Sequence, residues 1–347
     1  MAGSGTAHLR EGDALLRVEN LVVEFPAGAG RRVHAVSDVS LDVLTGETLG
    51  LVGESGCGKS TTGRAVMQLP RPTSGQVWFE GRDLTRLGGD ELRRTRTRLQ
   101  MIFQDPISSL NPRRSVRDIV GEPLAIWQIG TPADRRRRVA EVLDAVGLDA
   151  EAAGDRRPHQ FSGGQCQRIS IARALMLEPK LVICDEPVSA LDVSVQAQIL
   201  NLLEDMKARY GLTMIFIAHD LAVVRNVSDR VAVMYLGKLC EVAPADDLYR
   251  APAHPYTATL LASVPVPDPA VRPDPSVSDL DVELPSPLAP PSGCRFRTRC
   301  PRAEAVCAER EPQMREVAAG HFAACHFALE PSAAAAGHTS WRERRDA

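Results

Sequence analysis

The chain has 347 residues, enough for one large domain with an appendage or for two domains. Hydrophobic residues make up 44% of it and charged residues 24%, an ordinary globular balance. The formal net charge of −3 reveals no basic excess, which argues against a dedicated nucleic-acid binder.

Membrane insertion and secretion are not expected either. No apolar stretch approaches the roughly 20 residues that span a bilayer. The N-terminus lacks the charged start and long apolar run of a secretory signal. We therefore expect a cytosolic protein that meets a membrane only through partners.

The first part of the chain alternates between short apolar strands and turns. Residues 1–14 are small and polar and are predicted to be flexible. Alternating or buried-type patterns predict strands, and one helical segment stops at a proline. The expected elements are strands at Leu16–Phe25, Val36–Val43, Thr48–Val52 and Gln76–Phe79, with a helix at Ser60–Leu69 before Pro70.

The middle of the chain becomes helical and then returns to buried strands. The pattern is helical from about Asp90 to Pro158, and Ser162–Leu177 reads as a further helix. Leu181–Cys184 and Met214–Ile217 are strand candidates that end in acidic or histidine-bearing residues. Strands that alternate with helices predict an α/β fold with a mostly parallel sheet.

The C-terminal part differs in composition. Residues 264–291 are proline-rich and predict an extended linker, and the tail 331–347 is predicted to be disordered. Between them lie four of the eight cysteines; the other four sit inside predicted elements, where we expect buried side chains. In a reducing compartment a cysteine cluster binds metal more often than it forms disulfides. The clustered residues are Cys294, Cys300, Cys307 and Cys325.

The strongest chemical signal is the run GESGCGKS, Gly53 to Ser60, which matches the phosphate-loop pattern G-x-x-x-x-G-K-S/T. Glycines let the backbone turn so that N–H groups point at phosphate oxygens, and the following helix places its positive end there. We expect Lys59 to reach the β- and γ-phosphates and the Ser60 hydroxyl to hold Mg²⁺. A chance glycine turn explains this poorly, because the motif follows a strand and opens a helix.

A second signal is the acidic pair after the strand Leu181–Cys184. Asp185 can hold Mg²⁺ through water, and Glu186 can orient the attacking water as general base. Two acids after a strand also begin ordinary loops. Together with the phosphate loop, they point instead to nucleotide hydrolysis.

A third signal decides the class. The run FSGGQ, Phe161 to Gln165, starts a helix about 20 residues before the acidic strand. Ser-Gly-Gly alone is an ordinary turn, but in this order it resembles the signature motif of ATP-binding-cassette (ABC) ATPases. In that family two cassettes sandwich ATP head to tail, so that the phosphate loop of one subunit faces the signature of the other.

The resemblance extends from about Leu16 to Leu261 and implies further roles. Gln104 resembles the glutamine that touches Mg²⁺ and links ATP to the membrane partner. Asp192 stands where the family has the loop that crosses the dimer interface. His219 resembles the switch histidine that contacts the γ-phosphate. Phe25 stands where the family stacks an aromatic ring, more often tyrosine, on adenine.

The resemblance implies an ABC-type P-loop fold with a mostly parallel core sheet, an antiparallel β subdomain, a helical signature subdomain at about 105–177 and a small Cys-rich extension. The cassette would span 15–265 and the extension 266–330. Catalysis is expected from Glu186, His219 and Lys59, and Mg²⁺ binding from Ser60, Gln104 and Asp185. The ATP-binding residues are then Phe25, Gly53, Glu54, Ser55, Gly56, Cys57, Gly58, Lys59, Ser60, Thr61, Gln104 and Asp185, and the signature that acts on the partner's ATP is Ser162, Gly163, Gly164 and Gln165.

Three segments indicate which branch of the ABC family this sequence resembles. QDPISSLNPR at 104–113, AHPYTATLLASVP at 253–265 and the cysteine-bearing ending resemble the oligopeptide, dipeptide and nickel importers, and in particular the second ATPase subunit of a peptide importer. Such a subunit pairs with a different ATPase, two membrane permeases and an extracytoplasmic solute-binding protein, on the cytoplasmic side of the membrane. Nucleic acid is not an expected partner.

Two questions stay open from the sequence. The spacing C-x5-C-x6-C-x17-C allows an iron–sulfur cluster, Zn²⁺, or unligated or disulfide-bonded cysteines; the family implies a 4Fe–4S cluster with a structural role. The alternative functions are a nickel or other-solute importer, an exporter ATPase, a two-cassette translation factor and a DNA-repair type ABC ATPase. The repair class carries long insertions within the cassette, and none is visible.

Overall fold

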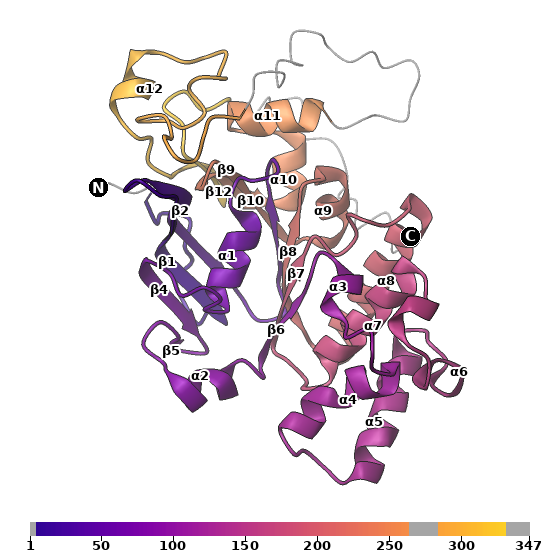
Figure 1. The fold of residues 1–347 in the computed structure, drawn as a ribbon. Coiled ribbons are helices and arrows are strands. Elements are labelled where there is room, and N and C mark those ends of the chain that lie inside the picture. The colour runs from indigo at the N-terminus through magenta and orange to yellow at the C-terminus, as the bar shows by residue number, and fades with distance from the viewer. Residues whose placement is uncertain (1–4, 264–283, 331–347) are drawn as a thin grey trace, which may run out of the picture. The chain divides into compact units, whose positions relative to one another are not determined.

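A computed structural model describes residues 5–263 and 284–330 of the chain. The chain divides into two compact units, one made of the residues up to Arg86 and from Ala218 onward, the other of Leu87–Ile217. Figure 1 shows the helices and strands of both. Most of the expected linker and all of the expected tail, as well as residues 1–4, lie outside the described ranges.

The first unit contains an antiparallel sheet and a set of core strands. The antiparallel sheet has the order β2-β1-β4-β5. Among the core strands, β3 pairs in parallel with β9, and β9, β10, β12 and β11 pair antiparallel in that order. The strands are β1 (Leu16–Pro26), β2 (Arg32–Val43), β3 (Thr48–Val52), β4 (Ser74–Phe79), β5 (Arg82–Asp83), β9 (Arg230–Tyr235), β10 (Lys238–Pro244), β11 (Arg315–Ala318) and β12 (His321–Ala323).

Burial explains the contrast between these strands. All five residues of β3 are buried, as expected for a parallel strand covered on both faces, and β9 is buried throughout. β1 alternates between buried and partly exposed residues, as expected for a strand in a sheet with one solvent-exposed face. The helices of this unit are α1 (Lys59–Val66), α9 (Leu221–Val227), α10 (Ala245–Arg250), α11 (Pro255–Ala262) and α12 (Ala305–Glu309).

The second unit places helices around a short parallel sheet. Its strands β6, β7 and β8 pair in parallel in that order, and α7 contacts β6. In the helical part, α4 packs against α5, α6 and α7. The elements are α2 (Gly89–Thr95), β6 (Leu99–Ile102), α3 (Pro106–Ser109), α4 (Val116–Ile126), α5 (Pro132–Ala145), α6 (Ala150–Gly154), a 3-10 turn (Pro158–Gln160), α7 (Gly163–Leu175), β7 (Leu181–Asp185), α8 (Val193–Tyr210) and β8 (Thr213–Ala218).

The expected α/β class and antiparallel sheet are confirmed. Each predicted strand ends within four residues of the observed strand, and Thr48–Val52 is predicted with its observed bounds. The helix expected at Ser60–Leu69 is α1, which begins at Lys59 and ends at Val66. It stops before Pro70 because the backbone of Gln68 turns into the left-handed region, with φ 60°.

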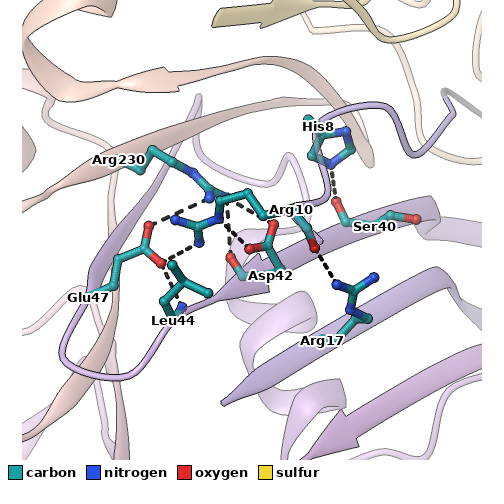
Figure 2. A network of polar contacts seen from close by, with 8 residues as sticks. All are labelled: His8, Arg10, Arg17, Ser40, Asp42, Leu44, Glu47 and Arg230. Atoms are coloured by element: carbon teal, nitrogen blue, oxygen red, sulfur yellow. Dashed lines mark hydrogen bonds and ion pairs between the residues drawn. The ribbon is translucent and has the colours of Figure 1, made fainter. Parts of the chain in front are cut away.

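The N-terminal segment differs from the prediction of a flexible stretch at 1–14, because two side chains within it are held in place. His8 is 3% exposed, and its Nε2 lies 2.7 Å from the carbonyl oxygen of Ser40. Arg10 forms ion pairs with Asp42 and Glu47. Figure 2 shows this network.

Figure 2 also shows a second arginine, Arg230, at the buried carboxylate of Asp42. Arg230, at the start of β9, donates to the same Asp42 and pairs with Glu47. Two arginines thus face two carboxylates, so that neither buried acid is left without a counter-charge. The polar composition of the segment hid this anchoring, since it depends on partners that are distant in sequence.

Across the described residues, no helix combines the length and the apolarity that crossing a membrane would take.

Candidate nucleotide-binding site

The phosphate loop lies where the sequence predicts it, between β3 and α1 in the first unit. Its glycines are required by close backbone contacts. A Cβ on Gly53, whose φ is 150°, would lie 2.0 Å from the carbonyl oxygen of Met234, and one on Gly58, with φ 107°, would lie 2.2 Å from that of Ala35. No other residue type fits these two positions.

Lys59 opens α1 and is buried, with 4% of its surface exposed. Its Nζ donates to the carbonyl oxygens of Gly53 at 2.7 Å and Glu54 at 2.9 Å. The ammonium is therefore held over the loop by the loop's own backbone. This is the position from which a lysine can exchange carbonyl oxygens for phosphate oxygens.

Cys57 fills the inner side of the loop and is 1% exposed. Burial raises the pKa of its thiol, although the neighbouring Lys59 acts in the opposite direction. The thiol is therefore kept protonated and shielded. A buried, protonated thiol of this kind is not expected to react readily with thiol reagents.

The acidic pair lies at the end of β7 in the second unit. Asp185 is fully buried and Glu186 is 8% exposed. Glu186 has a left-handed backbone with φ 47°, and its N–H donates to the carbonyl oxygen of Ile217 at 3.0 Å. A strained glutamate held by the neighbouring strand is typical of a functional site.

Gln104 approaches the same carboxylate. It follows β6, and its Nε2 donates to Oε2 of Glu186 at 3.1 Å. Asp105 caps α3 by accepting from the N–H groups of Ile107 and Ser108, which fixes the turn after Gln104. The structure thus joins two residues that the sequence analysis assigned to Mg²⁺ and water.

The predicted signature forms the start of α7. Ser162 is the N-cap and forms a capping box with Gln165: Gln165 N–H donates to Ser162 Oγ, and Ser162 N–H donates to Gln165 Oε1. Ser162 and Gln165 are exposed. Cys166, one residue on, is buried, and its Sγ lies 3.5 Å from the carbonyl oxygen of Pro158.

The two signature glycines differ in their surroundings. A Cβ on Gly164 would lie 2.5 Å from Cγ1 of Val195 on α8, whereas one on Gly163 would lie 3.5 Å from Leu191. Val195 is β-branched and stiff in its helix, so it cannot turn aside easily. Gly164→Ala is therefore expected to destabilise the fold by about 1–3 kcal/mol.

Urea denaturation of the two variants separates these glycines. Gly163→Ala serves as the control, since it meets only ordinary contact and is expected to be neutral or slightly stabilising. Equal free energies of unfolding for Gly163→Ala and Gly164→Ala would contradict a steric role for Gly164.

Three further residues to which the sequence analysis gave roles are exposed. Asp192 is exposed and is the N-cap residue of α8. His219 is exposed directly after β8. Phe25 lies on β1 opposite Val33 and is 37% exposed, an open aromatic ring of the kind that adenine stacking requires.

The four scattered cysteines, Cys57, Cys166, Cys184 and Cys240, are all buried as predicted. The clustered ones come near one another. Burial raises the pKa of Cys294 to about 11, and Cys325, Cys307 and Cys300 add to this rise. The N–H of Cys294 also donates to the carbonyl oxygen of Cys307 at 2.8 Å.

These thiols do not converge on one point. Within 5–263 and 284–330, no group of three or more His, Cys, Asp or Glu side chains is arranged to hold a metal ion. A single Zn²⁺ needs four ligands around one centre, which this arrangement lacks. An iron–sulfur cluster is less demanding in this respect, because its cysteines bind separate iron atoms.

Comparison with known proteins decides the family. Residues 36–189 match the profile described as ABC transporter, and residues 240–307 match the oligopeptide/dipeptide transporter C-terminal region. The oligopeptide transport ATP-binding protein AppF of Bacillus subtilis is 50% identical over 326 residues, covering 91% of this chain and 98% of AppF. The chain belongs to the ABC transporter family.

Other relatives agree with this membership. OppF of Salmonella typhimurium, an oligopeptide transport ATP-binding protein, is 50% identical over 88% of this chain and 94% of its own length. A dimeric ATP-binding cassette in a post-hydrolysis state with ADP and Pi has a TM-score of 0.61 and 30% identity, over 66% of this chain and 98% of that chain. As an ABC cassette, the chain is an ATPase that uses ATP and Mg²⁺.

Sequence reasoning missed two residues that the structure brings to the phosphate loop of this ABC cassette. Arg299 and Tyr256 both contact Glu54. They stand in the runs RTRC and HPYT, which the sequence analysis used only as marks of a subfamily. No local pattern links either run to the loop, because they follow it by about 200 residues or more.

Proposed function

We propose that this chain is an ATP-hydrolysing subunit of an importer for dipeptides or oligopeptides, energising transport through two membrane permeases. The observation that carries the proposal is the 50% identity, over about nine-tenths of the chain, to oligopeptide transport ATP-binding proteins. The match of residues 240–307 to the oligopeptide/dipeptide transporter C-terminal region supports it. A second, different ATPase and an extracytoplasmic solute-binding protein complete the assembly, with this chain on the cytoplasmic side of the membrane.

The roles of the site residues follow from the proposed pairing of two cassettes. Ser162, Gly163, Gly164 and Gln165 act on the partner's ATP, while this chain's phosphate loop faces the partner's signature. The exposed capping box supports this, since the first N–H groups of α7 form a helix start suited to phosphate. A relative solved as a dimer with ADP and Pi is a precedent for the pairing.

ATP hydrolysis then controls opening of the dimer. The phosphate charge is shared between two positive helix ends while ATP is bound. Ser60, Gln104 and Asp185 are the residues that would supply ligands to the Mg²⁺ that accompanies ATP. Glu186 orients the water for attack on the γ-phosphate, and His219 and Asp192 contact the γ-phosphate and the dimer interface. After cleavage the bridge between the helix ends is lost, and the cassettes separate.

The alternative functions have less support. A nickel or other-solute importer uses the same cassette, since the solute is selected by other subunits. A DNA-repair type cassette carries long coiled-coil or zinc insertions, whereas the longest helix among residues 5–263 is α8 with 18 residues.

Expression with the neighbouring permeases tests the transport proposal. We expect the chain to co-purify with two permeases and a second ATPase, and peptide to stimulate ATP hydrolysis of the assembly when a solute-binding protein is present. Nickel salts under the same conditions serve as the control for the alternative solute. Co-purification with nucleic acid instead of permeases would contradict the proposal.

We further propose that Cys294, Cys300, Cys307 and Cys325 hold a 4Fe–4S cluster with a structural role. Four thiolates are the ligand set of such clusters, and the electrostatic interaction among these thiols supports their proximity. Protein purified without oxygen is expected to contain about four iron atoms per chain and a broad visible absorption. Cys307→Ser is expected to lose both; stoichiometric zinc without iron would contradict the cluster.

A further inference from the structure

Glu54, the second residue of the phosphate loop, is held through all three of its polar groups. Its carboxylate accepts from Nη1 of Arg299 at 3.0 and 2.9 Å. Its N–H donates to the hydroxyl of Tyr256 at 2.9 Å. Its carbonyl oxygen accepts from Nζ of Lys59 at 2.9 Å. Two of these three partners come from the C-terminal half of the chain, outside the loop.

The arginine is positioned by its surroundings rather than by the loop alone. Only 2% of the Arg299 side chain is exposed, and the same Nη1 lies 3.4 Å from the hydroxyl of Tyr235. Within this buried site the guanidinium thus has a carboxylate and a hydroxyl as partners. A buried charge with one carboxylate partner fixes that carboxylate firmly.

The tyrosine is fixed by an aromatic cluster. Tyr256 is fully buried, and its ring centroid lies 4.7 Å from that of Tyr235 and 5.3 Å from that of Phe296. Burial lowers the pKa of His254 to about 4, so its neutral ring accepts the N–H of Tyr256 through Nδ1. The cluster thus anchors both the HPYT run and the segment 294–300, which carries Phe296 and Arg299.

A second contact joins the same segment to the loop. Arg295 donates to the carbonyl oxygen of Leu236 in the turn between β9 and β10. The next residue of that turn, Gly237, donates its N–H to the carbonyl oxygen of Cys57 at 2.7 Å. The cysteine-bearing segment therefore supports the loop from two sides, at Glu54 and at Cys57.

We propose that Arg299 and Tyr256 are positioning residues that hold Glu54, and with it the carbonyl oxygens that orient Lys59, so that the segment 294–300 sets the nucleotide affinity of the phosphate loop. Neither side chain needs to touch the nucleotide. Each acts through Glu54, because a shift of this residue moves an anchor of the lysine that meets the phosphates. The inference rests on the loop as the ATP site.

Binding of Mg·ADP to the purified full-length chain tests the inference, because ADP needs the loop but permits no hydrolysis. Arg299→Ala and Tyr256→Phe are each expected to weaken binding about tenfold, the effect of losing one hydrogen bond to a charged or fixed group. Arg299→Lys is expected to restore part of the affinity. Arg297→Ala is the matched control, since this arginine of the same segment donates to Ser292, away from the loop.

A double-mutant cycle separates positioning from general destabilisation. The cycle compares Glu54→Gln, Arg299→Ala and the variant that carries both changes. If Arg299 acts through Glu54, the double variant binds Mg·ADP with an affinity no lower than that of the single variant with the larger loss. Should Arg299→Ala fail to fold, Tyr256→Phe carries the test, since it removes one oxygen and keeps the ring cluster.

Two results would overturn the inference. One is affinity of Arg299→Ala and Tyr256→Phe equal to that of Arg297→Ala; the other is fully additive losses in the cycle. Wild-type chain that does not bind Mg·ADP would instead overturn the ATP site itself, so the two failures are distinguishable.

Discussion

Glu186→Gln is expected to lower the ATPase kcat of the assembled transporter by about 10²- to 10⁴-fold, the range for removing a general base. ATP affinity should stay intact, because the phosphate loop is unchanged. The substitution is nearly isosteric, and Gln104 Nε2, which donates to the carboxylate at 3.1 Å, can donate to the amide oxygen instead. The ATP-bound, closed dimer should accumulate, which gel filtration in the presence of Mg·ATP detects.

Glu178→Gln provides a matched control for this variant. Glu178 has a left-handed backbone with φ 50°, close to the 47° of Glu186, but its side chain is 71% exposed and paired with Arg138. The same chemical change at a similarly strained position is therefore expected to leave turnover unaltered. Normal hydrolysis by Glu186→Gln would show that another group activates the water.

Local patterns were sufficient for the elements on which the site is built. The phosphate loop was predictable because β3 is fully buried and ends at a glycine pattern whose backbone contacts allow no side chain. The signature helix was predictable because Ser162, the residue before it, is a strong N-cap and Gln165 completes the capping box. Each of these signals lies within a few residues of sequence.

The remaining features depend on partners far apart in the chain. The anchoring of His8 and Arg10 could not be predicted, because their partners lie 32 to 37 residues further along the chain, at Ser40, Asp42 and Glu47. The contacts that hold Glu54 were equally hidden, since they come from Tyr256 and Arg299, both distant in sequence. Charged residues in a polar run carry no local sign of whether they will meet a buried carboxylate.

The cysteines show that sequence spacing alone does not identify a bound metal or cluster. Burial of the four scattered residues was predictable from their apolar neighbours, and the structure agrees. The spacing of the other four leaves the ligand open, because intervening loops decide whether thiols converge on one ion or surround a larger group. In the described ranges they do not form a group around a single ion. Iron analysis, rather than spacing, distinguishes the alternatives.

Lys59→Ala is expected to weaken ATP binding by about 100-fold or more, since hydrogen bonds to charged groups contribute about 1.5–3 kcal/mol each and 1.4 kcal/mol is tenfold. Alanine also leaves the carbonyl oxygens of Gly53 and Glu54 without the ammonium that now holds them. The loop then loses both its cation and an internal tie. Equilibrium binding of Mg·ATP to the purified chain measures the loss.

The control for Lys59→Ala is Arg64→Ala, which removes an exposed cation from the same helix, α1, five residues later. If the general positive field of the helix attracted the phosphates, both variants would weaken binding similarly. If the lysine acts by direct contact, only Lys59→Ala will weaken binding. A nucleotide affinity of Lys59→Ala equal to that of the wild type would rule out this role. Glu186→Gln should retain ATP binding and lose turnover, whereas Lys59→Ala should lose ATP binding. The two results together would assign nucleotide affinity to the phosphate loop and hydrolysis to the acid that follows β7.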